Sequence, residues 1–193
     1  RSRGLGDVYK RQTEMSAGTT FVIVNLLGGI SVLGGYVFGL YLFPDQRELL
    51  WGGLQGRWRI VFTVSMLMAA AGYLAFFYGI VVKSNPASFS LGILNGYHAI
   101  SILATIFLIS ASIWMPVTLI YLKSMNSAWW IISVASLWIT ATSLIALTVM
   151  VVISPLAIPS VFARMLAIIG ISYITFHCLV FDAIIWVSRF HGR

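Results

Sequence analysis

Five long apolar stretches, separated by short polar segments, dominate this sequence. Each is long enough to cross the roughly 30 Å hydrocarbon core of a bilayer as an α-helix, which takes about 20 residues. None shows the alternation of apolar and polar residues that marks a membrane β-barrel strand. We therefore predict an all-α membrane protein, a bundle of five transmembrane helices. The expected spans are about 20–43, 59–82, 97–122, 128–153 and 161–188.

The composition supports the same class and excludes a soluble domain. Hydrophobic residues make up 60% of the chain and charged residues 9%, whereas soluble domains carry about 25% charged residues. We interpret the net charge of +7 as Lys and Arg that flank membrane helices, and we expect no nucleic-acid partner. The single cysteine, Cys178, excludes an internal disulfide.

The first twelve residues, Arg1–Gln12, are polar and basic, unlike everything that follows. Their VYKRQ run resembles translated adapter sequence, so we predict a non-native tail and set it apart from the fold. A genuine basic tail is the alternative. We expect residues 13–193 to form one transmembrane domain.

Positive charges decide the orientation, because five spans place the two termini on opposite sides of the membrane. The side with the first loop, the third loop and the C-terminus carries Arg47, Arg57, Arg59, Lys123, Arg189 and Arg193. Once Arg1–Gln12 is set apart, the other side carries Lys83 and Arg164. We therefore predict a multi-pass protein with an outside N-terminus and a cytoplasmic C-terminus.

Glycines crowd the first span, and Gly35 and Gly39 form a GxxxG pattern there. Glycines at this spacing let another helix backbone approach closely. We expect packing within the chain, and a homodimer through the Gly35/Gly39 face is the alternative.

Pro116 lies inside the third span, where it removes the hydrogen bond to the Ser112 carbonyl and predicts a kink. Trp114 lies near this kink, at membrane depth. Because a buried indole N–H needs an acceptor, we expect a hydroxyl or the freed Ser112 carbonyl to accept from it. Trp51, in the polar loop Pro44–Arg57, suits either interfacial anchoring or covering a cavity.

The fifth span contains His177, Cys178 and Asp182. A carboxylate is costly inside a membrane, and it usually faces a partner or a water-filled cavity. On an α-helix, at about 100° per residue, Asp182 shares a face with Cys178 and lies about 140° from His177. We therefore predict that His177 and Asp182 are not neighbours. Structural hydrogen bonding and ligand or ion contact both stay open for Asp182, as do packing and cavity lining for His177.

Catalytic motifs are absent from the sequence. There is no GxSxG, HExxH or P-loop pattern. The three histidines, His98, His177 and His191, are scattered and lack metal-ligand spacing. We therefore predict that the protein is not an enzyme and holds no metal.

Short motifs in three of the spans resemble a known family. They are WMP at 114–116, the run from Met68 to Tyr73 and Leu74, and FDAIIW at 181–186. These are similar to the W-x-P, M-G-x-x-x-Y-L and L-N-x-x-x-W motifs of the translocator proteins, also called tryptophan-rich sensory proteins, with Asp182 in place of an asparagine. The proline-rich first-loop motif of that family has no counterpart here, and Ala111 stands where it has a second asparagine.

The resemblance implies an apolar cavity inside the five-helix bundle that binds a porphyrin or a sterol. It places Trp114, the Tyr173 region and the first loop around the ligand. Together with the reading of the individual residues, the predicted ligand-binding set is Trp114, Tyr173, His177, Trp51, Tyr73 and Asp182.

The leading hypothesis is therefore a membrane sensor or translocator that binds a hydrophobic, aromatic small molecule. A small proton-coupled transporter that uses Asp182 is one alternative, and a non-catalytic subunit of a membrane complex is another. A cholesterol-type pattern, Leu119-x-Tyr121-x-Lys123, closes the third span, and we interpret it as interfacial anchoring.

Overall fold

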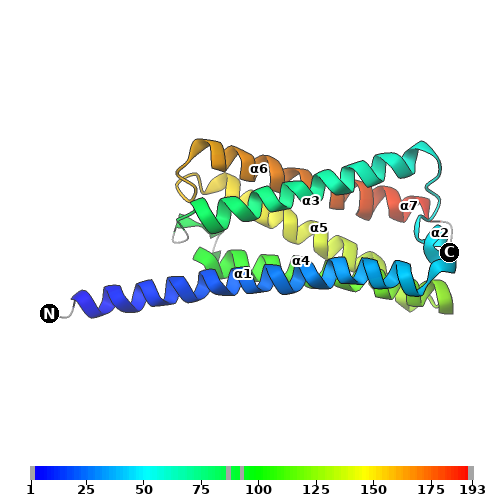
Figure 1. Cartoon of the computed structure of the whole chain (residues 1–193), viewed down its shortest axis with the longest axis horizontal. Helices are drawn as coiled ribbons and strands as arrows, with labels where there is room; N and C mark the ends of the chain where they lie inside the picture. The colour runs from blue at the N-terminus through cyan, green and yellow to red at the C-terminus, as the bar shows by residue number, and fades with distance from the viewer. Residues whose placement is uncertain (1–2, 86–87, 92–93, 191–193) are drawn as a thin grey trace.

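The computed structural model describes residues 3–85, 88–91 and 94–190, which form an elongated bundle of long helices (Figure 1). Five helices are long and apolar enough to cross a membrane: Gly18–Leu42, Arg57–Lys83, His98–Ser124, Ser127–Ile153 and Val161–Arg189. Each end lies within two residues of the predicted span. The predicted all-α bundle of five transmembrane helices is therefore confirmed, while its orientation stays a prediction.

Short elements connect these helices. In chain order the elements are α1 (Arg3–Leu42), the 3-10 turn η1 (Pro44–Gln46), α2 (Arg47–Leu50), α3 (Arg57–Lys83), β1 (Ser90–Leu91), β2 (Leu94–Asn95), α4 (Gly96–Ser124), α5 (Ser127–Ile153), α6 (Val161–Phe176), the π-helix η3 (His177–Trp186) and α7 (Val187–Arg189). The two strands pair antiparallel between α3 and α4. The last span consists of α6, η3 and α7 in succession.

Sequence signals set several helix ends. α1 ends at Leu42, just before Pro44, which cannot donate an amide hydrogen bond. Asn126 caps α5 because its side chain accepts from a first-turn backbone amide at 2.9 Å. α1 begins at Arg3, so it runs from the segment that we set apart into the first span. Whether Arg1–Gln12 is native stays a prediction.

Two helix pairs form opposite edges of the bundle, and α5 lies between them. α1 packs along α4, α3 packs along α6, and α5 contacts both α4 and α6. Figure 1 shows α1 and α3 diverging toward the cyan end of α3. At the opposite end the two helices are joined, because Phe21 stacks on Phe77 and Tyr73 donates to Asn25.

Glycines bring the backbones of α3 and α6 together. A Cβ on Gly72 would lie 2.7 Å from the Gly170 carbonyl oxygen, and a Cβ on Gly170 would collide with Gly72 in return. One more contact follows two turns along, where a Cβ on Gly79 would lie 2.9 Å from the Ala167 side chain. Close approach of this kind is how small residues stabilise helix pairs in membranes.

Pairs of hydroxyl groups join the helices across the apolar core. They are Ser110 with Thr140 (2.8 Å) and Thr118 with Ser133 (2.7 Å) between α4 and α5, and Thr148 with Thr175 (2.8 Å) between α5 and α6. A buried polar group in lipid has no water partner, so these bonds satisfy groups that would otherwise be costly. Each is expected to stabilise the bundle by about 0.6 kcal/mol.

The two GxxxG glycines of α1 have different surroundings. A Cβ on Gly39 would lie 3.0 Å from Met115 of α4, so Gly39 packs within the chain as expected. No described atom lies within 4 Å of the position that a Cβ on Gly35 would take. The homodimer through the Gly35/Gly39 face stays a prediction.

The substitution Gly170→Ala should lower the free energy of unfolding by about 1–3 kcal/mol, because its methyl group overpacks the crossing of α3 and α6. Gly34→Ala is the matched control, since no described atom lies within 4 Å of its Cβ position. It should leave the stability unchanged or slightly higher, because alanine favours a helix over glycine. Reversible unfolding in mixed detergent measures both variants, and equal stabilities would contradict this crossing.

Candidate functional site

A π-helical segment interrupts the last span and changes which side chains meet. α6 ends at Phe176, and the next ten residues form η3. A π-helix bonds residue i to residue i+5, and such segments are frequent at functional sites. His177 and Asp182 are five residues apart, and their Nε2 and Oδ1 atoms lie 3.6 Å from each other. Our prediction that they are not neighbours is therefore wrong, because it assumed the rotation of an α-helix throughout.

Ser65 of α3 joins this pair to the tyrosine one turn before it. Its Oγ lies 2.9 Å from His177 Nδ1 and accepts from the Tyr173 hydroxyl at 3.2 Å. The Tyr173 hydroxyl also lies 3.6 Å from the Met68 sulfur. Two of the predicted residues, Tyr173 and His177, are thus connected through a serine that our sequence analysis did not single out.

Asp182 lies at the partly open side of this group. Cys178 lies one turn earlier on the same π-helix. On the other side, the Tyr36 hydroxyl of α1 lies within electrostatic range of Asp182. His177 is almost fully buried, at 4% exposed, whereas the Asp182 side chain keeps 31% of its surface exposed. Asp182 is therefore the more exposed member of the pair.

Trp114 lies next to Tyr36, with the ring centroids 5.7 Å apart. Trp114 also contacts Trp186, which lies one turn beyond Asp182. These two rings meet edge-on, with their centroids 5.3 Å apart. The Trp114 indole N–H is buried and has no hydrogen-bond partner in the described part of the chain. We expected a hydroxyl or the Ser112 carbonyl to accept from it, and that expectation is wrong. The result is a buried donor whose ring contacts Trp186, the residue one turn beyond Asp182.

The first loop closes this end of the bundle. Trp186 donates its indole N–H to the Leu50 carbonyl at 2.9 Å, which fixes α2 against η3. Trp51 packs against the same aromatic cluster, and the Arg59 guanidinium lies 5.5 Å from its ring centroid. Arg59 in turn pairs with Glu48 at 2.7 Å. The predicted residue Trp51 thus lies beside the aromatic part of the site.

Tyr73 lies elsewhere in the bundle. Its hydroxyl donates to Asn25 Oδ1 at 2.5 Å, and its ring contacts Phe107 of α4 at 5.2 Å. It is eight residues beyond Ser65 on α3, which corresponds to about 12 Å along a helix. The structure therefore separates Tyr73 from the other five predicted residues, and it gives Tyr73 a role in holding α1, α3 and α4 together.

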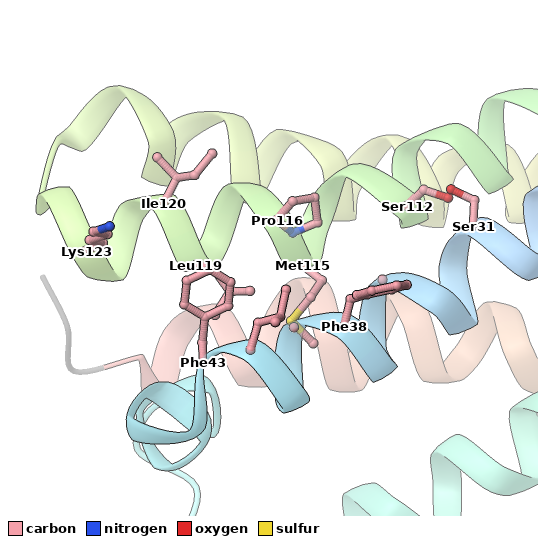
Figure 2. Close-up of a pocket in the computed structure, with 12 residues that line it drawn as sticks. Ser31, Phe38, Phe43, Ser112, Met115, Pro116, Leu119, Ile120 and Lys123 are labelled. Atoms are coloured by element: carbon pink, nitrogen blue, oxygen red, sulfur yellow. The ribbon is translucent and has the colours of Figure 1, made fainter.

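Two adjoining hollows lie between α1 and α4, with volumes of about 470 and 460 Å³. They share Ser31, Ser112 and Pro116, and Figure 2 shows the two serine hydroxyls facing each other. None of the six predicted residues lines either hollow. Met115 and Leu119 line the first hollow, and they also pack against Tyr36 and Trp114. One layer of side chains therefore separates the hollow from the aromatic part of the site.

The cholesterol-type pattern does not form one surface. Leu119 and Lys123 line the first hollow. Tyr121 is 4% exposed and packs instead against Trp130 and Phe190. The three residues of the pattern therefore do not converge on a shared ligand.

Tyr36 and Ser65 are the residues of this group that our sequence analysis missed. A signal for Tyr36 exists, because it lies eleven residues after Asn25, about three full helical turns, and thus on the same face of α1. For Ser65 the sequence gives no comparable signal, because it is one small polar residue within an apolar span.

Comparison with known proteins gives no relative: no protein-family model, no curated protein and no solved structure matches the chain.

The contact between Ser65 and His177 predicts an energetic coupling. In a double-mutant cycle, Ser65→Ala and His177→Ala should show a coupling free energy of about 0.6 kcal/mol, with about 1.7 kcal/mol as the upper end for membrane hydrogen bonds. A control cycle pairs Ser65→Ala with Ser110→Ala, whose hydroxyl faces Thr140 instead. Unfolding in mixed detergent measures both cycles. If the losses of unfolding free energy in the first cycle are additive, this bond does not form.

Proposed function

We propose that this protein binds a hydrophobic, aromatic small molecule inside the membrane, as a sensor or translocator, in the region between α1, α4 and η3. The observation that carries the proposal is the Trp114 indole N–H, a buried donor without an acceptor in the described residues. Leaving such a donor unpaired costs about 1–3 kcal/mol. A ligand that accepts this hydrogen bond would recover that free energy.

The surroundings of Trp114 suit an aromatic ligand. Tyr36, Trp114 and Trp186 form a continuous series of ring contacts. Aromatic pairs contribute about 0.5–1.5 kcal/mol beyond the burial of their apolar surface. Ligand sites are typically apolar with a few convergent polar groups, and Asp182 and the Trp114 N–H would be those groups here.

The position of the hollows favours a ligand that arrives from the lipid. The first hollow lies one layer of side chains from Trp114, and Met115 belongs to that layer. Methionine is unbranched and adapts easily to a neighbouring molecule. A rotamer change at Met115 would connect the hollow with the aromatic rings.

The proposal keeps the expected classes of ligand, a porphyrin or a sterol, which come from the resemblance to the translocator proteins. No catalytic role is proposed. An outside N-terminus and a cytoplasmic C-terminus belong to the same proposal, and the charge distribution in the loops supports them.

Protoporphyrin should quench the tryptophan emission of the purified protein in a saturable manner. Trp114→Phe keeps most of the ring and removes the N–H, so it should weaken binding about tenfold, the equivalent of about 1.4 kcal/mol. Trp138→Phe is the control, because Trp138 is 43% exposed on α5 and outside the aromatic cluster. Absence of saturable quenching, or equal affinity in both variants, would count against the proposed site.

The contact between His177 and Asp182 favours a second candidate function, proton-coupled transport. Ionisable residues inside a membrane bundle often form proton pathways, and transporters place such sites near the middle of interrupted helices. η3 is an interruption of that kind, and it contains both residues.

This candidate predicts proton movement that depends on Asp182. A pH-sensitive dye inside proteoliposomes should report a change in internal pH when protoporphyrin is added outside. Asp182→Asn should abolish this change, because an amide cannot bind and release a proton as a carboxyl does. Asp45→Asn, in the turn η1, is the control and should behave like the unmodified protein. Proton movement that persists in Asp182→Asn would remove this candidate.

A further inference from the structure

The carboxyl of Asp182 has no lysine or arginine close to it along the membrane. Residues 20–43, 60–82, 97–122, 128–153 and 165–188 contain neither residue type. The basic residues of the five spans lie at the span ends: Arg57, Arg59, Lys83, Lys123, Arg164 and Arg189. Among the described residues, the ion-pair partner of Asp182 is His177 at 3.6 Å. Inside the spans this site therefore contains one acidic group, and the basic group at its edge, Arg59, is paired with Glu48.

The hydrogen bonds around His177 can be satisfied by a neutral ring. Tyr173 donates to Ser65 Oγ, so Ser65 can use its own proton for His177 Nδ1. An imidazole that accepts at Nδ1 carries its proton at Nε2, and this N–H faces Asp182. In this tautomer His177 supplies a weak donor to the carboxylate and no compensating charge.

Aromatic rings border Asp182 on several elements. Phe181 and Trp186 flank it on η3, and Tyr36 of α1 lies one ring contact beyond Trp186, through Trp114. Phe181 contacts Phe62 of α3 edge-on at 4.8 Å, and Trp186 contacts Trp114 of α4. Rings of this kind can attract a cation over their faces, most strongly when water is excluded.

We propose that the ligand of this site is a lipophilic cation with aromatic rings, such as a hydrophobic amine or an onium ion, whose positive centre pairs with Asp182. The inference rests on the proposed function and names its ligand class. An acidic group bordered by aromatic rings attracts a cation, because the positive centre favours the ionised carboxyl and can also interact with the rings. The partial exposure of Asp182 gives the positive centre access to the carboxyl.

The same arrangement disfavours an anionic ligand. A porphyrin that carries carboxylates would have to bind with those groups turned away from Asp182, because like charges in a medium of low dielectric repel strongly. A sterol would offer a single hydroxyl and no charge, so it would leave the carboxylate uncompensated. Charge is thus the property that separates these classes.

Tetraphenylphosphonium and tetraphenylborate test this directly, because they carry the same four phenyl rings and opposite charges. Equilibrium dialysis with the purified full chain should show saturable binding of the phosphonium and none of the borate. Asp182→Asn should weaken phosphonium binding at least about tenfold, whereas Asp182→Glu should retain most of it. Asp45→Asn, an exposed carboxylate outside the site, should bind like the unmodified protein.

The outcomes separate this inference from the proposed function. Equal binding of both ions, or unchanged phosphonium binding in Asp182→Asn, would overturn the cation assignment. Saturable protoporphyrin quenching without phosphonium binding would also overturn it, and would leave the proposed function standing. Binding of neither ion nor protoporphyrin would overturn both. Asp182→Asn could also lose binding because it misfolds. Asp182→Glu controls for this, because it changes the same residue and keeps the carboxyl.

Discussion

The backbone hydrogen bonds of the last span decide which polar groups meet inside this bundle. A chain in lipid must satisfy its backbone amides and carbonyls internally, so it cannot simply unwind to redirect a side chain. The π-helix η3 keeps the hydrogen bonds and widens the turn. His177 and Asp182 therefore come to one side of the helix without exposing backbone groups to the membrane.

Packing around η3 holds this arrangement in place from two directions. On α3, Ser65 and Gly72 lie seven residues apart on one face, and they meet His177 and Gly170, which are also seven residues apart. The glycine contact thus brings α3 close enough for Ser65 to reach the imidazole. At the far end, the bond from Trp186 to the Leu50 carbonyl fixes the first loop against the last span.

The arrangement of α1 explains why a carboxylate in the bundle stays accessible. α1 packs along α4 and is joined to α3 by Phe21 and Asn25 at one end. The helices diverge toward the cyan end of α3, which is the end that carries the first loop (Figure 1). The result is an aromatic region with one carboxyl that is neither fully buried nor paired with a strong base.

The spans were predictable because apolar length is a direct consequence of bilayer thickness. The site was only partly predictable from the sequence. Tyr173, His177 and Asp182 stood out as polar groups in an apolar helix, yet their mutual positions depended on a π-helical register that residue spacing does not show. The contact of Tyr73 with Asn25 was not predictable from one span, because Asn25 lies on another helix. The missing acceptor of Trp114 is likewise a property of packing, which no single span reveals.

The most direct test of this account is the distance between the His177 imidazole and the Asp182 carboxyl in the membrane. Solid-state NMR on protein with 15N-labelled histidine rings and 13C-labelled aspartate carboxyls can measure it, and His177→Asn identifies the signal among the three histidines. The account predicts dipolar dephasing that matches the 3.6 Å contact of Nε2 with Oδ1 and disappears in the variant. Absence of dephasing, as in an uninterrupted α-helix with the two groups on different faces, would contradict it.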